Sequence, residues 1–159
     1  MGTANHRRLT AGVAAGGGTF DGRKIFGFSQ DFTSFGGALG EVYAEKIHKV
    51  MDLAESTGAP LVGLNDGGGA RIQEGVVSLA SYGGIFNRNV RASGVIPQIS
   101  VGHGPCGGGE VYSPALPRFI LMVRGVSQMD ITGPAVVLTV PAREGTQHAL
   151  AGLRTPTAA

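Results

Sequence analysis

Two glycine clusters contain the residues whose types and spacing could do chemistry. The first covers residues 65–70 (NDGGGA), and the second covers residues 102–109 (GHGPCGGG). Each cluster follows a short apolar run and precedes a segment with helical features. Glycine permits left-handed backbone conformations and lacks the Cβ atom that keeps a ligand away from the main chain. Because the first N–H groups of a helix have no partner inside it, we predict two turns whose amides face outward.

If the two turns end neighbouring strands, their amides could converge on one oxygen atom and form an oxyanion hole made of backbone. The alternative for either cluster alone is an ordinary tight turn. Phosphate-binding loops fit the sequence poorly. There is no G-x-x-x-x-G-K-[ST] motif, and residues 102–107 match G-x-G-x-x-G only with Pro105 inside the loop and no acidic strand-end residue about 20 positions on.

The rest of the pattern predicts the elements that position these turns. Asp21-Gly22 predicts a two-residue hairpin turn within residues 19–25, and an apolar stripe over residues 41–57 predicts a helix that Gly58 ends. Further strands are expected at 24–29, 59–64, 95–101, 119–123 and 129–132, and further helices at 73–92, 110–116 and 135–140. Continuous apolar runs are typical of strands buried on both faces. Strands that alternate with helices favour a parallel sheet with crossover helices.

Composition excludes several classes of protein. Hydrophobic residues make up 42% of the 159 residues and charged residues 15%, which favours a folded core over disorder. A net charge of +2 is too small to indicate nucleic acid, a single cysteine excludes an intramolecular disulfide, and no apolar run predicts a membrane span. The basic start lacks the apolar region of a secretion signal. We therefore expect a bacterial cytoplasmic location in preference to the mitochondrial matrix.

Several ordered stretches carry a resemblance to a known family. They are residues 28–37 (FSQDFTSFGG), 63–75 (GLNDGGGARIQEG), 92–100 (ASGVIPQIS), 104–106 (GPC) and 111–116 (VYSPAL). Together they resemble the carboxyltransferase β subunit of biotin-dependent acyl-CoA carboxylases, of the propionyl-CoA carboxylase β-chain type. The resemblance runs from about residue 17 to residue 152, and it implies more about function than composition does.

The resemblance implies an α/β fold of the ClpP/crotonase type, with ββα units, a mostly parallel sheet and, here, an incomplete single domain. Its implied limits are a flexible segment at 1–16, an acyl-CoA-binding half at 17–152 and a frayed tail at 153–159. The implied reaction, part of fatty acid metabolism, moves carboxylate from carboxybiotin to propionyl-CoA or acetyl-CoA. It proceeds through an enolate that an oxyanion hole stabilises.

By the same resemblance, the acyl-CoA oxyanion hole is made by backbone amides, and we place it at Gly69, Ala70, Gly108 and Gly109. The amides of Ala70 and Gly108 are the most specific expectation. Weaker contacts with CoA or the acyl group are expected at Gly68, Arg71 and Gly107, where Arg71 could instead pair with Glu74 or Asp66. This chemistry requires no metal in the domain, and biotin belongs on a separate carrier domain.

The implied partners are a biotin carboxylase and biotin carrier subunit and a second carboxyltransferase half, in a homo-oligomer without nucleic acid or membrane. The chain lacks the family's second half, so we expect no activity from it alone. Two alternatives remain. One is a truncated or degenerate non-catalytic assembly partner. The other is a crotonase-type acyl-CoA hydratase or methylmalonyl-CoA decarboxylase that uses Glu110.

The sequence departs from the family pattern near the proposed hole. Gly67 stands where a serine is usual, Glu110 replaces an alanine, and Asp130 lies in a segment more polar than the family's. We expect Glu110 to be a rim carboxylate or a damaging substitution, because a buried unpaired carboxylate costs several kcal/mol.

Three further residues could in principle be reactive. Cys106 beside a helix start could have a lowered pKa, but packing is the favoured interpretation. His103 is expected in a loop. Ser113 with Asp130 and His148 could form a triad, yet no G-x-S-x-G motif supports one.

Overall fold

The computed structural model describes residues 10–131, in which a six-stranded sheet carries the two glycine clusters at the ends of neighbouring strands. Its strands are β1 (Val13–Phe20), β2 (Arg23–Gln30), β3 (Leu61–Gly67), β4 (Gln98–Gly107), β5 (Phe119–Met122) and β6 (Gln128–Asp130). The order is β1-β2-β3-β4-β5, and β6 also pairs with β4. Only the β1–β2 pair is antiparallel among these strands, so the mostly parallel sheet is confirmed.

The predicted hairpin is present, and it is longer than the sequence pattern indicated. Asp21 and Gly22 both have positive φ, 48° and 73°, as a two-residue primed turn requires. This turn pairs β1 with β2 along their full length. Residues 13–16 therefore belong to the sheet and not to the flexible segment predicted for residues 1–16.

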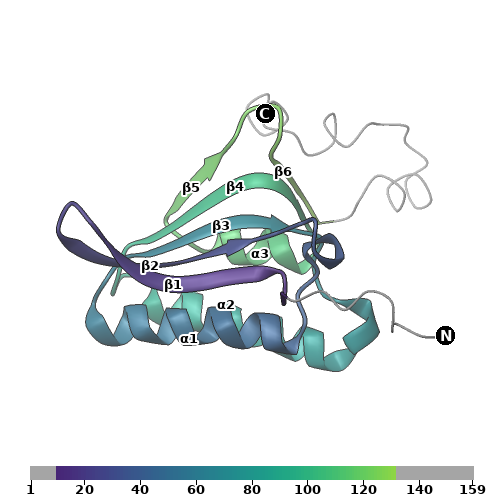
Figure 1. The fold of residues 1–159 in the computed structure, drawn as a ribbon, viewed down its shortest axis with the longest axis horizontal. Coiled ribbons are helices and arrows are strands. Elements are labelled where there is room, and N and C mark those ends of the chain that lie inside the picture. The colour runs from purple at the N-terminus through teal and green to yellow at the C-terminus, as the bar shows by residue number, and fades with distance from the viewer. Residues whose placement is uncertain (1–9, 132–159) are drawn as a thin grey trace.

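Helix α1 (Glu41–Thr57) has the predicted bounds and provides much of the core. Its apolar stripe is buried, including Tyr43, Ile47 and Met51. The helix ends at Gly58, whose left-handed conformation (φ 68°) lets its N–H cap the last turn. Figure 1 shows α1 beside α2 (Val76–Ala92) along one face of the sheet.

Helix α2 begins later than predicted. Gly75 has φ 57° and ψ −132°, a conformation outside the helical region, so the segment before it forms only the short 3-10 helix η3 (Ile72–Glu74). From Val76 the helix continues to Ala92 as expected. Arg88 pairs with Asp52 of α1 at 2.8 Å, which ties the two helices together at the surface.

Strands β3 and β4 extend into the segments that we predicted as loops. Gly67 of β3 still pairs with Cys106 of β4, after an irregularity in the register that follows Asn65. Sheet pairing outweighs the flexibility of glycine here, and it places His103 within a strand instead of a loop. Helix α3 (Gly109–Ala115) follows directly, close to its predicted position.

The strand predicted at residues 119–123 is present as β5, but it is exposed and not buried as we expected. Phe119, Ile120 and Leu121 of β5 are 52%, 44% and 57% exposed. The strand pairs with β4 on one side and is not covered within residues 10–131. An apolar run alone could not distinguish this position from a buried one.

Some expectations fall outside the described residues. The helix predicted at 135–140, the tail at 153–159 and His148 all lie beyond residue 131. Among the residues that were searched, no helix is both long and apolar enough to cross a bilayer.

Candidate active site

The two glycine turns lie side by side at the carboxyl ends of β3 and β4. A Cβ atom placed on Gly69 would lie 2.8 Å from the carbonyl oxygen of Gly107 and 3.6 Å from the nitrogen of Gly109. The parallel pairing of the two strands explains this approach, because it brings their ends to the same edge of the sheet. The turns are therefore close enough to contribute to a single site.

Glycine is required at the centre of each turn. Gly69 has φ 92° and Gly108 has φ 58°, values that residues with a side chain rarely adopt. At Gly69 there is also no room for a side chain, because a Cβ would be closer to Gly107 than van der Waals contact allows. These two positions explain why glycine clusters here instead of other turn residues.

The backbone of the first turn points the N–H group of Ala70 away from Leu39, the residue that pairs with this turn. The Leu39 N–H donates to the Gly69 carbonyl and the Arg71 N–H donates to the Leu39 carbonyl, both at 2.9 Å. Since successive amides alternate in direction along an extended chain, the Ala70 N–H points away from Leu39. No protein acceptor is assigned to it within residues 10–131.

The second turn presents the amide of Gly109 and not that of Gly108. The Gly108 N–H donates to the carbonyl of Asp130 at 3.0 Å, because β6 pairs with the end of β4. This bond removes Gly108 from the pair of donors that we expected. Gly109 is the first residue of α3, and its N–H has no acceptor in the described part of the chain. Ala70 and Gly109 are thus the two best-placed donors.

The residues expected near CoA have mostly structural partners. The Gly68 N–H donates to the Gly36 carbonyl at 3.0 Å. The Gly107 carbonyl faces Gly69 across the gap between the turns.

Arg71 is held by several groups at once. Its guanidinium pairs with Glu74 at 2.9 Å, donates to the Ala38 carbonyl at 2.9 Å and lies 4.8 Å from the centre of the Phe35 ring. Glu74 in turn accepts the Glu41 N–H at the start of α1. The predicted Arg71–Glu74 ion pair is therefore present.

Glu110 is not a rim carboxylate, so the first of the two alternatives expected for it was wrong, and the second, a damaging substitution, stays a prediction. Its side chain is buried, with 1% of its surface exposed, on the inner side of α3. The Tyr82 hydroxyl donates to Glu110 Oε2 at 2.8 Å, while Oε1 has no hydrogen-bond partner among the described residues. A Cβ atom on Gly67 would lie 3.1 Å from this carboxyl group. The carboxyl thus lies between the first turn and α2.

The surroundings of Glu110 favour its neutral form. Burial raises the pKa of Glu110 from 4.5 to about 7. The Tyr82 hydroxyl and the nearby Gln30 amide oppose that shift, while the charge of Asp66 adds to it. A buried carboxyl without a cationic partner holds its proton to higher pH than a carboxyl in water.

Cys106 packs in the core, as predicted. It is fully buried, and burial together with the nearby Glu110 raises the pKa of its thiol to about 12. A thiol that stays protonated is a poor nucleophile. Ser113 donates to Asn89 at 3.4 Å and does not need a triad to satisfy its hydroxyl.

Sequence reasoning missed Tyr82. A Cβ atom on Gly109 would lie 3.0 Å from its ring, so Tyr82 supports the second turn from below. The signal available in the sequence was a tyrosine on the buried stripe of a helix, since a buried hydroxyl needs a partner. Its partner, Glu110, is 28 positions further along the chain.

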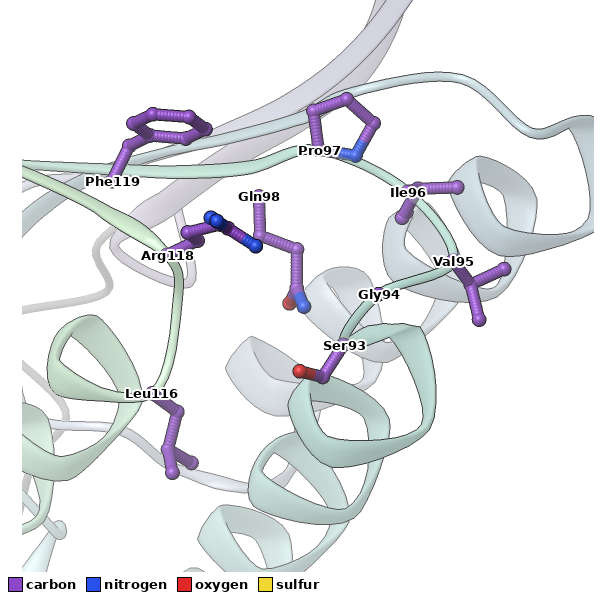
Figure 2. A pocket seen from close by; sticks show the side chains of 9 residues that line it. All are labelled: Ser93, Gly94, Val95, Ile96, Pro97, Gln98, Leu116, Arg118 and Phe119. Atoms are coloured by element: carbon purple, nitrogen blue, oxygen red, sulfur yellow. The ribbon is translucent and has the colours of Figure 1, made fainter.

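A pocket of about 620 Å³ lies at the other end of β4 (Figure 2). Ser93, at the end of α2, and Gln98, the first residue of β4, line it together with Arg118 and Phe119. The second glycine turn lies at the strand's far end, and the first lies beside it at the end of β3, so this pocket is separate from the candidate site. Among the described residues that were searched, no group of histidine, cysteine and acidic side chains could hold a metal ion.

Comparison with known proteins connects this geometry to a family. Residues 1–158 match the carboxyl transferase domain. The chain is 57% identical over 157 residues to the propionyl-CoA carboxylase beta chain of Cereibacter sphaeroides, covering 99% of this chain and 31% of that protein. It is 61% identical over 141 residues to the methylmalonyl-CoA decarboxylase subunit alpha of Veillonella parvula, covering 89% of this chain and 28% of that one.

Solved structures agree with these relatives. The transcarboxylase 12S structure, described as a hexamer with methylmalonyl-CoA and methylmalonic acid bound, superposes with a TM-score of 0.87 at 47% identity. The match covers 90% of this chain and 28% of that chain. The chain therefore spans about a third or less of these proteins, and its fold is the crotonase fold of their carboxyltransferase domains. With its paired glycine turns, this chain belongs to the carboxyl transferase domain family.

Proposed function

We propose that this chain forms the acyl-CoA-binding half of a carboxyltransferase, in which the amides of Ala70 and Gly109 bind the thioester oxygen of an acyl-CoA. The observation that carries the proposal is the approach of the two glycine turns, with Gly69 against Gly107 and Gly109. Both amides lack an acceptor within residues 10–131 and lie at the same edge of the sheet.

The chemistry follows from where charge develops. Removal of a proton from the α-carbon moves negative charge onto the thioester oxygen of the acyl-CoA. Two fixed N–H donors stabilise that enolate more than they stabilise the neutral thioester, and one such donor contributes about 3 kcal/mol in other enzymes. Carboxybiotin, as the co-substrate, would release CO₂ by cleavage of its N–C bond. The freed biotin nitrogen would take the α-proton, and the enolate carbon would attack the CO₂ to form the new C–C bond. Ala70 and Gly109 act by hydrogen bonding alone.

The relatives support propionyl-CoA or acetyl-CoA as the substrate and indicate the partners. We infer that a second carboxyltransferase half completes the site and that a biotin carrier subunit with its biotin carboxylase delivers the carboxyl group. A homo-oligomer fits the hexamer described for transcarboxylase 12S. We place the acyl-CoA-binding half at residues 17–152, enlarged by the start of the hairpin at Val13.

Calorimetry with propionyl-CoA tests the proposal directly. The chain, shown to be folded by circular dichroism, should bind propionyl-CoA and transfer carboxylate only when a biotin-side half is added. Free CoA is the matched control, because it lacks the thioester oxygen and should bind more weakly. A folded sample that binds neither ligand would support the non-catalytic assembly partner instead.

Decarboxylation is the second candidate, and the Veillonella relative favours it. Loss of CO₂ from methylmalonyl-CoA leaves negative charge on the same thioester oxygen, so the same two amides would stabilise it. The two candidates differ in their requirements. Release of CO₂ from methylmalonyl-CoA by this chain alone would favour the decarboxylase, whereas turnover only with a biotin-side half would favour the carboxyltransferase.

A further inference from the structure

The side chain of Glu110 connects three parts of the candidate site. It follows Gly109, whose amide is a proposed donor, and its carboxyl lies against Gly67 of the first turn. Tyr82 of α2 donates to the same carboxyl, and its ring also lies under Gly109. The carboxyl and the ring therefore fill the space directly beneath the two turns.

We propose that Glu110 is a positioning residue of the oxyanion hole, which as a neutral carboxylic acid holds the second glycine turn beside the first. This inference rests on the proposed function. Glu110 does not touch the substrate in this proposal and does not act as its acid or base. It acts through the amide of Gly109, whose position it sets through Tyr82 and Gly67.

The space around Gly67 supports this role. The carboxyl group lies 3.1 Å from where a Cβ on Gly67 would be, a contact tighter than most side chains tolerate. The carboxyl group of Glu110 therefore fits beside the first turn because residue 67 has no side chain.

The electrostatic surroundings favour the neutral form. The titratable groups that face Glu110 are Tyr43 on α1, Asp66 on β3, Tyr82 on α2 and Cys106 on β4. Beyond them lie Asp31 and Arg71, near Tyr43, and Asp130, near Cys106. Arg71 is the one cation in this set, and Glu74 already pairs with it at 2.9 Å. An ionised Glu110 would therefore have to seek solvent, which would pull on α3 and separate Gly109 from Ala70. Its charge would also oppose the charge that develops on an enolate.

The proposal predicts a loss of acyl-CoA affinity at alkaline pH. Burial raises the pKa of Glu110 to about 7, so the neutral form dominates at mildly acidic pH. Above that value the affinity for propionyl-CoA should fall by up to about tenfold per pH unit, because only the protonated protein has both turns in place. The variant Glu110→Gln, neutral at every pH, should lose this dependence. Equal pH dependence in both proteins would overturn the proposal.

A titration without ligand separates this inference from the proposed function. In the wild-type chain, NMR signals of the Gly109 and Ala70 amides should shift together with a midpoint near 7, matching the pKa of Glu110. The variant Tyr82→Phe should raise that midpoint, because the Tyr82 hydroxyl stabilises the ionised form. If the two amides share this midpoint but the protein binds no acyl-CoA, the positioning role of Glu110 would be supported and the proposed function would be contradicted. Amides that do not titrate, or a midpoint that Tyr82→Phe leaves unchanged, would overturn the inference.

Discussion

The two glycine turns of the candidate site are held in place by different kinds of interaction. The first turn is held mainly by bonds between uncharged groups: Leu39 bridges Gly69 and Arg71, Gly36 accepts the Gly68 N–H, and the Gln30 side chain accepts the Asp66 N–H. The second turn is held by the Asp130 carbonyl and by a buried side-chain pair, Glu110 with Tyr82. The first set of bonds is independent of pH, whereas the second contains a group that titrates.

This difference assigns the two turns different roles. A backbone-anchored turn offers a fixed donor, and mutations can disturb it mainly through steric clashes. A turn that depends on a buried carboxyl responds to protons and to single side-chain changes as well. Variants of a single turn, and one pair of variants that joins both turns, should reveal this difference.

Gly69→Ala should have the largest effect on the site. Its new Cβ would lie 2.8 Å from the Gly107 carbonyl, and its φ of 92° is unfavourable for alanine. We expect a loss of about 2–4 kcal/mol in stability, from strain and overlap together, and more than tenfold weaker propionyl-CoA binding. Denaturant unfolding and calorimetry measure the two effects.

Gly94→Ala is the matched control for this variant. Gly94 also has positive φ, 76°, but a Cβ there would meet nothing within 4 Å. It should cost about 1 kcal/mol in stability and leave binding unchanged. If Gly69→Ala and Gly94→Ala weakened propionyl-CoA binding equally, the close contact between the two turns would not be required for binding.

Glu110 should make the stability of the chain depend on pH. Its pKa is about 7 in the folded protein and near 4.5 when unfolded, so the folded state holds the proton more tightly. The contribution of this group is complete below pH 4.5 and is lost as pH rises through 7, a change of about 3 kcal/mol. The difference in unfolding free energy between wild type and Glu110→Gln should follow this curve. If this difference in unfolding free energy did not change with pH, the Glu110 carboxyl would be exposed to solvent and not buried.

Local features of the chain were predictable, because they depend on neighbouring residues alone. The stripe over α1, the left-handed Gly58 and the Asp21-Gly22 turn each follow from a few consecutive positions. The start of α2 was missed although its cause is also local. Gly75 breaks the helical conformation, but glycine within a helical pattern does not by itself show whether the helix tolerates it.

The positions of the two turns followed from the order of strands, and Ala70 and Gly109 are among the four amides that we expected there, but the bond that occupies the Gly108 amide could not be predicted. The Gly108 N–H is taken by Asp130, a pairing that depends on β6 returning to the end of β4. The burial of Glu110 likewise depends on Tyr82 and Gly67, which are distant in sequence. Such contacts between separate segments leave no periodic pattern that a single sequence reveals.

Positions 67 and 110 should be energetically coupled. Gly67→Ser alone would place a Cβ 3.1 Å from the Glu110 carboxyl and 3.0 Å from the Gly37 carbonyl oxygen, and only the first contact is relieved when Glu110 is shortened. Glu110→Ala alone would leave a cavity and an unpaired Tyr82 hydroxyl. Each should cost about 1–3 kcal/mol, and the double variant should cost less than their sum by about 1 kcal/mol or more. Urea unfolding of the four proteins completes the cycle. Strict additivity would mean that the two departures from the family pattern are unrelated.

Arg71→Lys should have the smallest effect. It tests whether Arg71 binds the ligand or only supports the structure of the first turn. The Arg71–Glu74 pair is partly exposed, with side chains 19% and 31% accessible, so losing its geometry should cost no more than about 1 kcal/mol. Because the guanidinium is already engaged by Glu74, the Ala38 carbonyl and the Phe35 ring, propionyl-CoA affinity should change by less than about twofold. The affinity for propionyl-CoA, measured for both proteins at two salt concentrations, distinguishes these two roles. A large loss with a reduced salt dependence would show that Arg71 leaves its structural partners to bind a CoA phosphate, and would make the first turn as dependent on a side chain as the second.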